Sequence, residues 1–192
     1  MKWIAVAILL VIVPYTFIRW HYRKPGHAFE PYHDMKDRAN TLRLLSAGFQ
    51  RVTIEAERPA DPISLPSTAT VTDAAAGLPP ALAASLVDEP LLPGDIVSVS
   101  AAATANPLLP YSIGFTCTVP DNKQQINEAH LYIRSSEIYV VVDFEKLNGD
   151  LLARSRTSLV RLNVPPGTLK TGRYRVTLVG SHTAKSWSLE VK

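Results

Sequence analysis

The first strongly hydrophobic stretch of the chain is WIAVAILLVIVPYTFI, which extends from Trp3 to Ile18 without a charged residue. An α-helix of sixteen residues measures about 24 Å at ~1.5 Å per residue, and about 27 Å when it continues to Trp20. This length is close to the ~30 Å hydrocarbon core of a bilayer. Pro14 is compatible with a membrane helix when its freed carbonyl finds another partner. The pattern therefore predicts one transmembrane helix within residues 1–20.

Aromatic and basic side chains at both ends of this stretch are typical of membrane-interface anchors. These side chains are Trp3, Trp20, Tyr22, Arg19, Arg23 and Lys24. A cleaved signal peptide is the alternative, but FIRWHYRKP follows the apolar run where a small-x-small cleavage site would be needed. We therefore expect an uncleaved single-pass protein of a bacterial-type inner (cytoplasmic) membrane, with the lipid bilayer as one partner.

The orientation signals disagree. The basic residues after the apolar run favour a cytoplasmic C-terminal domain. A two-residue head before the run is typical of an export signal-anchor, and by analogy β-sandwiches tethered by one helix are commonly extracytoplasmic. We expect the C-terminal domain on the extracytoplasmic, periplasmic side.

Residues 21–58 are expected to form a juxtamembrane strap, a short amphipathic helix and a strand. Asp34 suits the N-cap of the helix, and Gly48 suits its C-terminal end. The apolar residues of MKDRANTLRLLSAG share one helical stripe, made of Met35, Ala39, Leu42 and Leu45. Such a helix could lie on the bilayer surface or pack on the C-terminal domain or a partner, and we favour the domain. FQRVTIEAE then alternates as a half-exposed strand.

Residues 59–93 contain seven prolines and eight alanines, and they show no sustained hydrophobic period. The one exception is PPALAASLV, which predicts a short helix with proline in its first turn. We expect this region to be a Pro/Ala-rich spacer, or an irregular segment that contacts another surface.

From residue 94 to 192 the period becomes two. YSIGFTCTV places Tyr111, Phe115 and Cys117 on one apolar face, so Cys117 is expected to be a small core residue. LYIRSSEIYVVVDF predicts two strands around SSE, and Asn148-Gly149 predicts a hairpin turn. Together with SLVRLNV, RYRVTLVG and SWSLEV, about seven strands are expected. This spacing is typical of an antiparallel β-sandwich.

One segment of this domain, PPGTLKTGRYRVTL at residues 165–178, resembles the E–F corner and F strand of immunoglobulin-like and fibronectin type III-like domains. The resemblance rests on Leu169, Gly172 and Tyr174 and covers about half of the chain at the level of the fold. It implies that Tyr174 braces the sandwich through a hydroxyl bond to the backbone upstream. Val176 stands where antibody domains carry a cysteine, so their disulfide is not expected. The expected fold class is therefore all-β, an antiparallel immunoglobulin-like β-sandwich tethered by one N-terminal transmembrane helix.

The charge distribution argues against a nucleic-acid partner and concentrates basic side chains in one stretch of the sequence. The chain has 20 basic and 17 acidic residues and a net charge of +3, whereas nucleic-acid binding usually demands a strongly basic face. Residues 151–175 carry basic side chains and no acid. They include the candidate partner-docking residues Arg154, Arg156, Arg161, Arg173 and Arg175. Such a stretch could guide docking to a charged partner, but we favour the interpretation that it is a solvated sheet face.

Three histidines, His21, His27 and His33, recur every six residues in the strap. Helical metal ligands share a face at spacings of three or four, whereas a spacing of six places them on opposite sides. We therefore expect no joint metal site and no cofactor. The single cysteine, Cys117, also excludes an intramolecular disulfide and a cysteine-rich metal site.

No nucleophile-and-base spacing, phosphate loop or dinucleotide motif occurs, so we expect no enzymatic activity and identify no small-molecule substrate. The favoured hypothesis is a non-catalytic accessory subunit that stabilises a larger integral membrane complex, such as a respiratory or photosynthetic one, beside other membrane subunits. The alternatives are a membrane-tethered binding or metal-handling module that uses the strap histidines, and a tethered sandwich that binds a peptide or glycan.

Overall fold

The computed structural model describes residue 3 and residues 10–16, 31–59, 66–147, 152–153 and 155–192. It divides into two compact units, Met1–Met35 and Lys36–Lys192, which are described separately. In the first unit residues 10–16 are helical. No helix within the described residues is both long enough and apolar enough to cross a membrane. The expected span over residues 1–20 lies largely outside them, as do all of its interface anchors except the exposed Trp3.

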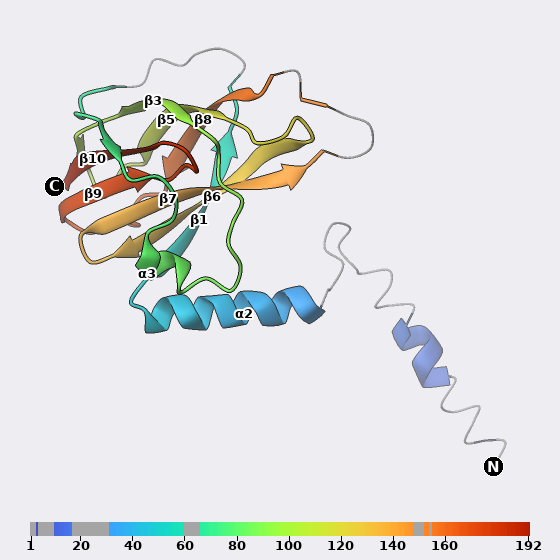
Figure 1. Cartoon of the computed structure of the whole chain (residues 1–192). Helices are drawn as coiled ribbons and strands as arrows, with labels where there is room; N and C mark the ends of the chain where they lie inside the picture. Colours follow the sequence, from blue (N-terminus) through green and yellow to red (C-terminus); the bar gives the residue numbers. More distant parts are fainter. Residues whose placement is uncertain (1–2, 4–9, 17–30, 60–65, 148–151, 154) are drawn as a thin grey trace. The chain divides into compact units, whose positions relative to one another are not determined.

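The second unit is mostly β-structure (Figure 1). Its helices are α2 (Pro31–Ser46, which begins in the first unit) and α3 (Pro80–Ala83). Its strands are β1 (Gln50–Glu57), β2 (Thr72–Ala74), β3 (Ile96–Ala101), β4 (Thr104–Ala105), β5 (Tyr111–Thr118), β6 (Gln124–Arg134), β7 (Glu137–Lys146), β8 (Thr157–Val164), β9 (Gly172–Leu178) and β10 (Ala184–Val191).

These strands form one mixed sheet in the order β2-β10-β9-β7-β6-β1-β8-β5-β3, with β4 beside β10. Most neighbours are antiparallel, but β7 runs parallel to β9 and β10 runs parallel to β4. The expectation of a purely antiparallel arrangement is therefore corrected. The reason lies in the connection after β7, because β8 joins a different part of the sheet before the chain returns as β9 in the direction of β7.

Strand β1 occupies a central place between β6 and β8. Its residues Gln50–Glu55 pair with β6, and Ala56 and Glu57 pair with β8. The sequence-based division placed the folded domain at residues 94–192. In the structure, β1, β2 and α3 come from before residue 94, and the compact unit begins at Lys36. The segment expected to be a spacer thus supplies an edge strand and a short helix.

The sheet curls around the larger of two hydrophobic clusters. Phe115 and Cys117 from β5 share this core with Trp187 and Leu189 from β10, although β5 and β10 stand far apart in the strand order. The Trp187 Nε1–H group donates to the Tyr111 hydroxyl at 3.1 Å, and that hydroxyl donates to the carbonyl oxygen of Ala102 at 2.9 Å. Cys117 is fully buried, and burial raises the pKa of its thiol to about 12.

A second cluster covers the other face of the sheet at β6 and β7, on the side where α2 and α3 lie (Figure 1). Its buried side chains are Leu44, Phe49, Leu82, Leu86, Leu92, Tyr132, Val141 and Val179. Besides Leu44, helix α2 is held by an ion pair between Lys36 and Asp88. The Asn40 Oδ1 atom also accepts from the Val87 N–H at 3.3 Å. The packed side of α2 is therefore the side that carries residues 36, 40 and 44.

The predicted apolar stripe of α2 points away from this cluster. Met35, Leu42 and Leu45 are 72%, 68% and 60% exposed, and Ala39 is exposed as well. The reason is geometric, since successive residues advance by about 100° around a helix and residues 35, 39, 42 and 45 lie opposite residues 36, 40 and 44. The helix does pack on the domain, but through a more polar side than the pattern predicts.

Tyr174 near the start of β9 makes a hydroxyl bond to the backbone upstream of it. Gly172 has a φ of 155°, a conformation that favours glycine. The Tyr174 hydroxyl donates to the carbonyl oxygen of Lys170 at 3.0 Å, and the Tyr174 ring packs against the core that also contains Leu169. Tyr174 thus links the turn to the core.

Replacing Tyr174 by phenylalanine is expected to lower the free energy of unfolding by about 1 kcal/mol, because the bond to Lys170 is lost. Tyr174→Ala is expected to cost more, on the order of 3 kcal/mol, because the ring contacts are lost too. Urea unfolding of the wild type and both variants at constant m-value would measure the two steps. Equal midpoints for all three proteins would show that Tyr174 does not brace the turn.

Candidate functional site

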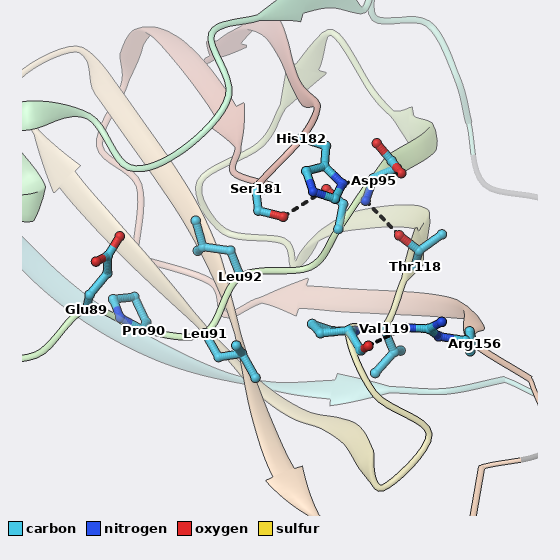
Figure 2. A pocket seen from close by; sticks show the side chains of 12 residues that line it. Glu89, Pro90, Leu91, Leu92, Asp95, Thr118, Val119, Arg156, Ser181 and His182 are labelled. Carbon is cyan, nitrogen blue, oxygen red and sulfur yellow. Dashed lines mark hydrogen bonds and ion pairs between the residues drawn. The ribbon is translucent and has the colours of Figure 1, made fainter.

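An open cleft of about 840 Å³ lies where the chain enters β3 and leaves β5 (Figure 2). We call it the β3–β5 cleft. It is lined by Glu89, Pro90, Leu91, Leu92, Gly94, Asp95, Thr118, Val119, Pro120, Arg156, Ser181 and His182. Three chain segments that are distant in sequence therefore meet around it, together with Arg156, which lies just before β8.

Backbone hydrogen bonds hold these segments together. The Gly94 N–H donates to the Thr118 carbonyl at 2.9 Å, and the Asp95 N–H donates to the Thr118 Oγ1 atom at 2.7 Å. On the other side, the N–H groups of Ser181 and His182 donate to the carbonyls of Pro93 and Gly94 at 2.7 and 2.9 Å. The walls of the cleft are thus fixed by main-chain bonds.

Glycine at position 94 is required by this close approach. A Cβ atom there would lie 2.6 Å from the Thr118 Oγ1 atom, which is too short for a van der Waals contact. That hydroxyl is already engaged by Asp95, so it cannot move away without losing the bond. The tight frame therefore depends on Gly94.

The cleft combines apolar and charged lining residues. Pro90, Leu91, Leu92, Val119 and Pro120 supply the apolar part. Among the charged residues, His182 Nδ1 lies 3.7 Å from Asp95 Oδ2, and the Arg156 guanidinium donates to the Pro120 carbonyl. Figure 2 shows Arg156 and His182 at separate places around the apolar residues. Such a surface suits binding of a segment with apolar and charged side chains.

Ser181, His182 and Asp95 include the residue types of a hydrolase triad, but their geometry is different. The Ser181 hydroxyl donates to the Gly94 carbonyl at 3.4 Å rather than to the imidazole. The His182 and Asp95 side chains are 73% and 48% exposed. A catalytic base would need to accept the serine proton within a protected site. The group is therefore arranged as a polar rim.

Metal binding has no candidate among the residues that the structure describes, since no three His, Cys, Asp or Glu side chains come together there in a way that could hold an ion. His21 and His27 lie outside the described residues, and His33 lies in α2 with its side chain outside them. The expectation about these three histidines stays a prediction.

The candidate docking arginines do not form one patch. Arg161 lies on β8, where its Nε atom is 3.9 Å from Glu57 Oε2, whereas Arg173 and Arg175 lie on β9 in another part of the sheet. Arg173 Nε is 3.5 Å from Glu190 Oε1, and Arg175 is paired in register with Glu137 of β7. Arg156 lines the β3–β5 cleft, and Arg154 is outside the described residues. These arginines are close in sequence but separate in the structure, because β8 and β9 are not neighbours in the sheet. Their role in docking a partner stays a prediction.

His130 on β6 belongs to a partly covered polar group beneath α2. Its Nε2 atom lies 3.1 Å from an Arg51 Nη2 atom, and its Nδ1 atom lies 3.1 Å from the Thr53 hydroxyl. Burial, followed by the Arg51 charge, lowers the pKa of His130 to about 4. His130 lies on the same face of β6 as Tyr132, which belongs to the second cluster, and its side chain is half-buried.

This low pKa predicts a pH-dependent stability. Between about pH 4 and 6.5 the unfolded chain binds a proton at His130 that the folded chain does not, so stability falls as the pH falls through this window. The slope from this residue is at most about 1.4 kcal/mol per pH unit. Urea unfolding at pH 7 and pH 5 should show a smaller loss for His130→Gln than for the wild type. Equal losses of stability for the wild type and His130→Gln would contradict the role of His130 in this pH dependence. His182→Gln, at an exposed histidine, is the control and should lose as much stability as the wild type.

Sequence reasoning missed the β3–β5 cleft because residues 89–93 were interpreted as spacer. The glycine and prolines of EPLLPGD gave no sign that Thr118 and Ser181 would close around them, since those contacts span long separations in the chain. Comparisons of the chain with protein-family models, curated proteins and solved structures gave no match.

Proposed function

We propose that this protein is a non-catalytic, single-pass accessory subunit that stabilises a larger integral membrane complex. In this proposal the N-terminal apolar segment anchors the chain, and the β3–β5 cleft receives a segment of a neighbouring subunit. The observation that carries the proposal is the β3–β5 cleft, whose walls are joined by hydrogen bonds and which has an apolar lining and a charged rim. A respiratory or photosynthetic complex of a bacterial-type inner membrane would suit such a subunit, with the β-rich domain on the extracytoplasmic side.

The chemistry of the cleft supports a protein partner. Protein interfaces have an apolar centre surrounded by polar residues that exclude water and set the register. Leu91, which is 47% exposed, and the half-buried Pro90 and Pro120 provide the apolar centre. Arg156 and Asp95 provide opposite charges. Opposite charges at a rim select a partner by complementarity and by steering its approach. The fixed main-chain frame limits the entropy lost on binding.

We also propose that the domain is related to immunoglobulin-like sandwiches. The Tyr174–Lys170 bond and the core shared by β5 and β10 support this reading. The parallel pairing of β7 with β9 gives the sheet a mixed character. Fold likeness supplies no function by itself. The proposed accessory role therefore rests on the β3–β5 cleft.

Affinity purification of the tagged full chain from its native membranes in mild detergent tests the proposal. Leu91→Asp should reduce the recovery of integral membrane proteins at least several-fold, because a carboxylate would be buried in the interface. Leu109→Asp is a matched control, since Leu109 is also an exposed leucine and does not line the cleft. Equal recovery with Leu91→Asp and wild type would reject the cleft as the docking site. If the wild-type chain is recovered without integral membrane proteins, the accessory role is rejected.

A further inference from the structure

We propose that the outer side of α2 lies on an anionic lipid surface. This side consists of Met35, Ala39, Leu42 and Leu45, with Arg38 and Arg43 exposed next to them. The inference rests on the membrane anchor of the proposed function, but it does not depend on any protein partner in the β3–β5 cleft.

Helix α2 is fixed to the domain by the side that carries residues 36, 40 and 44. Leu44 is 1% exposed within the second cluster, Asn40 accepts from the Val87 N–H, and Lys36 pairs with Asp88. Turning the helix to bury Leu42 and Leu45 against the sheet would break all three contacts. The apolar outer side is therefore presented away from the domain.

The outer side of α2 has the chemistry of a membrane-surface helix. Leucine and methionine side chains next to guanidinium groups match the boundary between acyl chains and anionic headgroups, where apolar groups enter and basic groups stay at the surface. A protein partner would also cover apolar side chains. The arginines and the adjacent anchor favour the bilayer.

The start of α2 is close in sequence to the end of the proposed membrane anchor. Only 12 residues separate Ile18, the last residue of the apolar run, from Pro31, the first residue of α2. Whatever their conformation, they span at most about 45 Å. A tether of this length confines the start of the helix to within about 45 Å of the end of the proposed anchor. Weak intrinsic affinity is then sufficient, because binding is intramolecular.

Site-directed spin labelling of the full chain tests this proposal. The protein would be reconstituted into phosphatidylcholine vesicles with and without phosphatidylglycerol, and labelled at Leu45→Cys or Leu109→Cys. These two leucines are a matched pair, since each is 60% exposed, and Leu109 is distant from α2 in the chain. Cys117 is fully buried and should remain unlabelled in the folded protein. Frequent collision of the spin label with oxygen indicates that the label is in lipid. Frequent collision with a water-soluble nickel chelate indicates that it is in solvent.

We expect the ratio of oxygen to nickel accessibility at position 45 to rise several-fold in vesicles that contain phosphatidylglycerol, and to stay low at position 109. Leu42→Cys should repeat the result for position 45. Replacing Arg38 and Arg43 by glutamine should reduce the ratio to the value in phosphatidylcholine alone.

Three results would overturn the proposal. A solvent-like label at positions 45 and 42 would show that α2 does not touch lipid. A label shielded from both oxygen and nickel would show a protein contact, such as a second copy of the chain. Equal ratios at positions 45 and 109 would show that no particular face is involved. If the proposed function failed but α2 touched lipid, membrane-protein recovery would be lost while the label result remained.

Discussion

A chain that begins at Gly94 is expected not to fold, whereas a chain that begins at Lys36 is expected to unfold cooperatively. The shorter chain lacks β1, which bridges β6 and β8 in the middle of the sheet. It also lacks six buried side chains, namely Leu44, Phe49, Ile54, Leu82, Leu86 and Leu92. At ~1.5–3 kcal/mol each, their loss is on the order of 10 kcal/mol, which is comparable with the whole stability of a domain at ~5–15 kcal/mol.

Circular dichroism and urea unfolding of the two purified chains would measure this difference. The chain from Lys36 should give one transition detected by far-ultraviolet signal and by tryptophan fluorescence. A cooperative transition of similar midpoint in the chain from Gly94 would contradict the central place of β1. It would instead support residues 94–192 as an independent domain.

Trp187→Ala is expected to lower the free energy of unfolding by about 3–5 kcal/mol, the largest effect of any single substitution considered. Trp187 is 2% exposed and fills the core between the two sides of the curled sheet. Its removal loses apolar contacts and leaves a cavity. Trp187→Phe should cost less, because a ring remains and the Tyr111 hydroxyl keeps its bond to the Ala102 carbonyl.

A double-mutant cycle with Tyr111→Phe separates the hydrogen bond from the packing. Burial raises the pKa of Tyr111 to about 12, so its hydroxyl is protonated at neutral pH and accepts the indole N–H while donating to Ala102. The costs of Trp187→Phe and Tyr111→Phe should not add, because both remove the same bond. Strict additivity, or a cost of Trp187→Ala below about 1 kcal/mol, would contradict a closed core at this point.

Local pattern predicted the strands well where alternation was strong. YSIGFTCTV corresponds to β5 with Phe115 and Cys117 inside, and the two strands around SSE are β6 and β7. PPALAASLV contains α3, which opens with Pro80. These elements depend on residues close together in the chain, which is why the sequence indicates them.

The arrangement of the elements could not be predicted in the same way. FQRVTIEAE was expected as a strand, but its partner residues in β6 and β8 lie more than seventy positions later, so nothing local indicated that β1 was central. Likewise, the apolar stripe of α2 was recognised, but the side that packs depends on Tyr132 and Val141 on the sheet. The β3–β5 cleft depends on main-chain bonds from Gly94 to Thr118 and His182, which have no sequence pattern.

An anchored accessory subunit should be extracted from the membrane together with integral membrane proteins, whereas an isolated tethered or secreted domain should not. Native mass spectrometry of the full chain, extracted from its own membranes in mild detergent, measures this directly. We predict the mass of a chain that retains residues 1–30, bound at a fixed ratio to integral membrane proteins. A monodisperse monomer, or a mature chain that begins between residues 18 and 30, would contradict the proposal of an anchored accessory subunit.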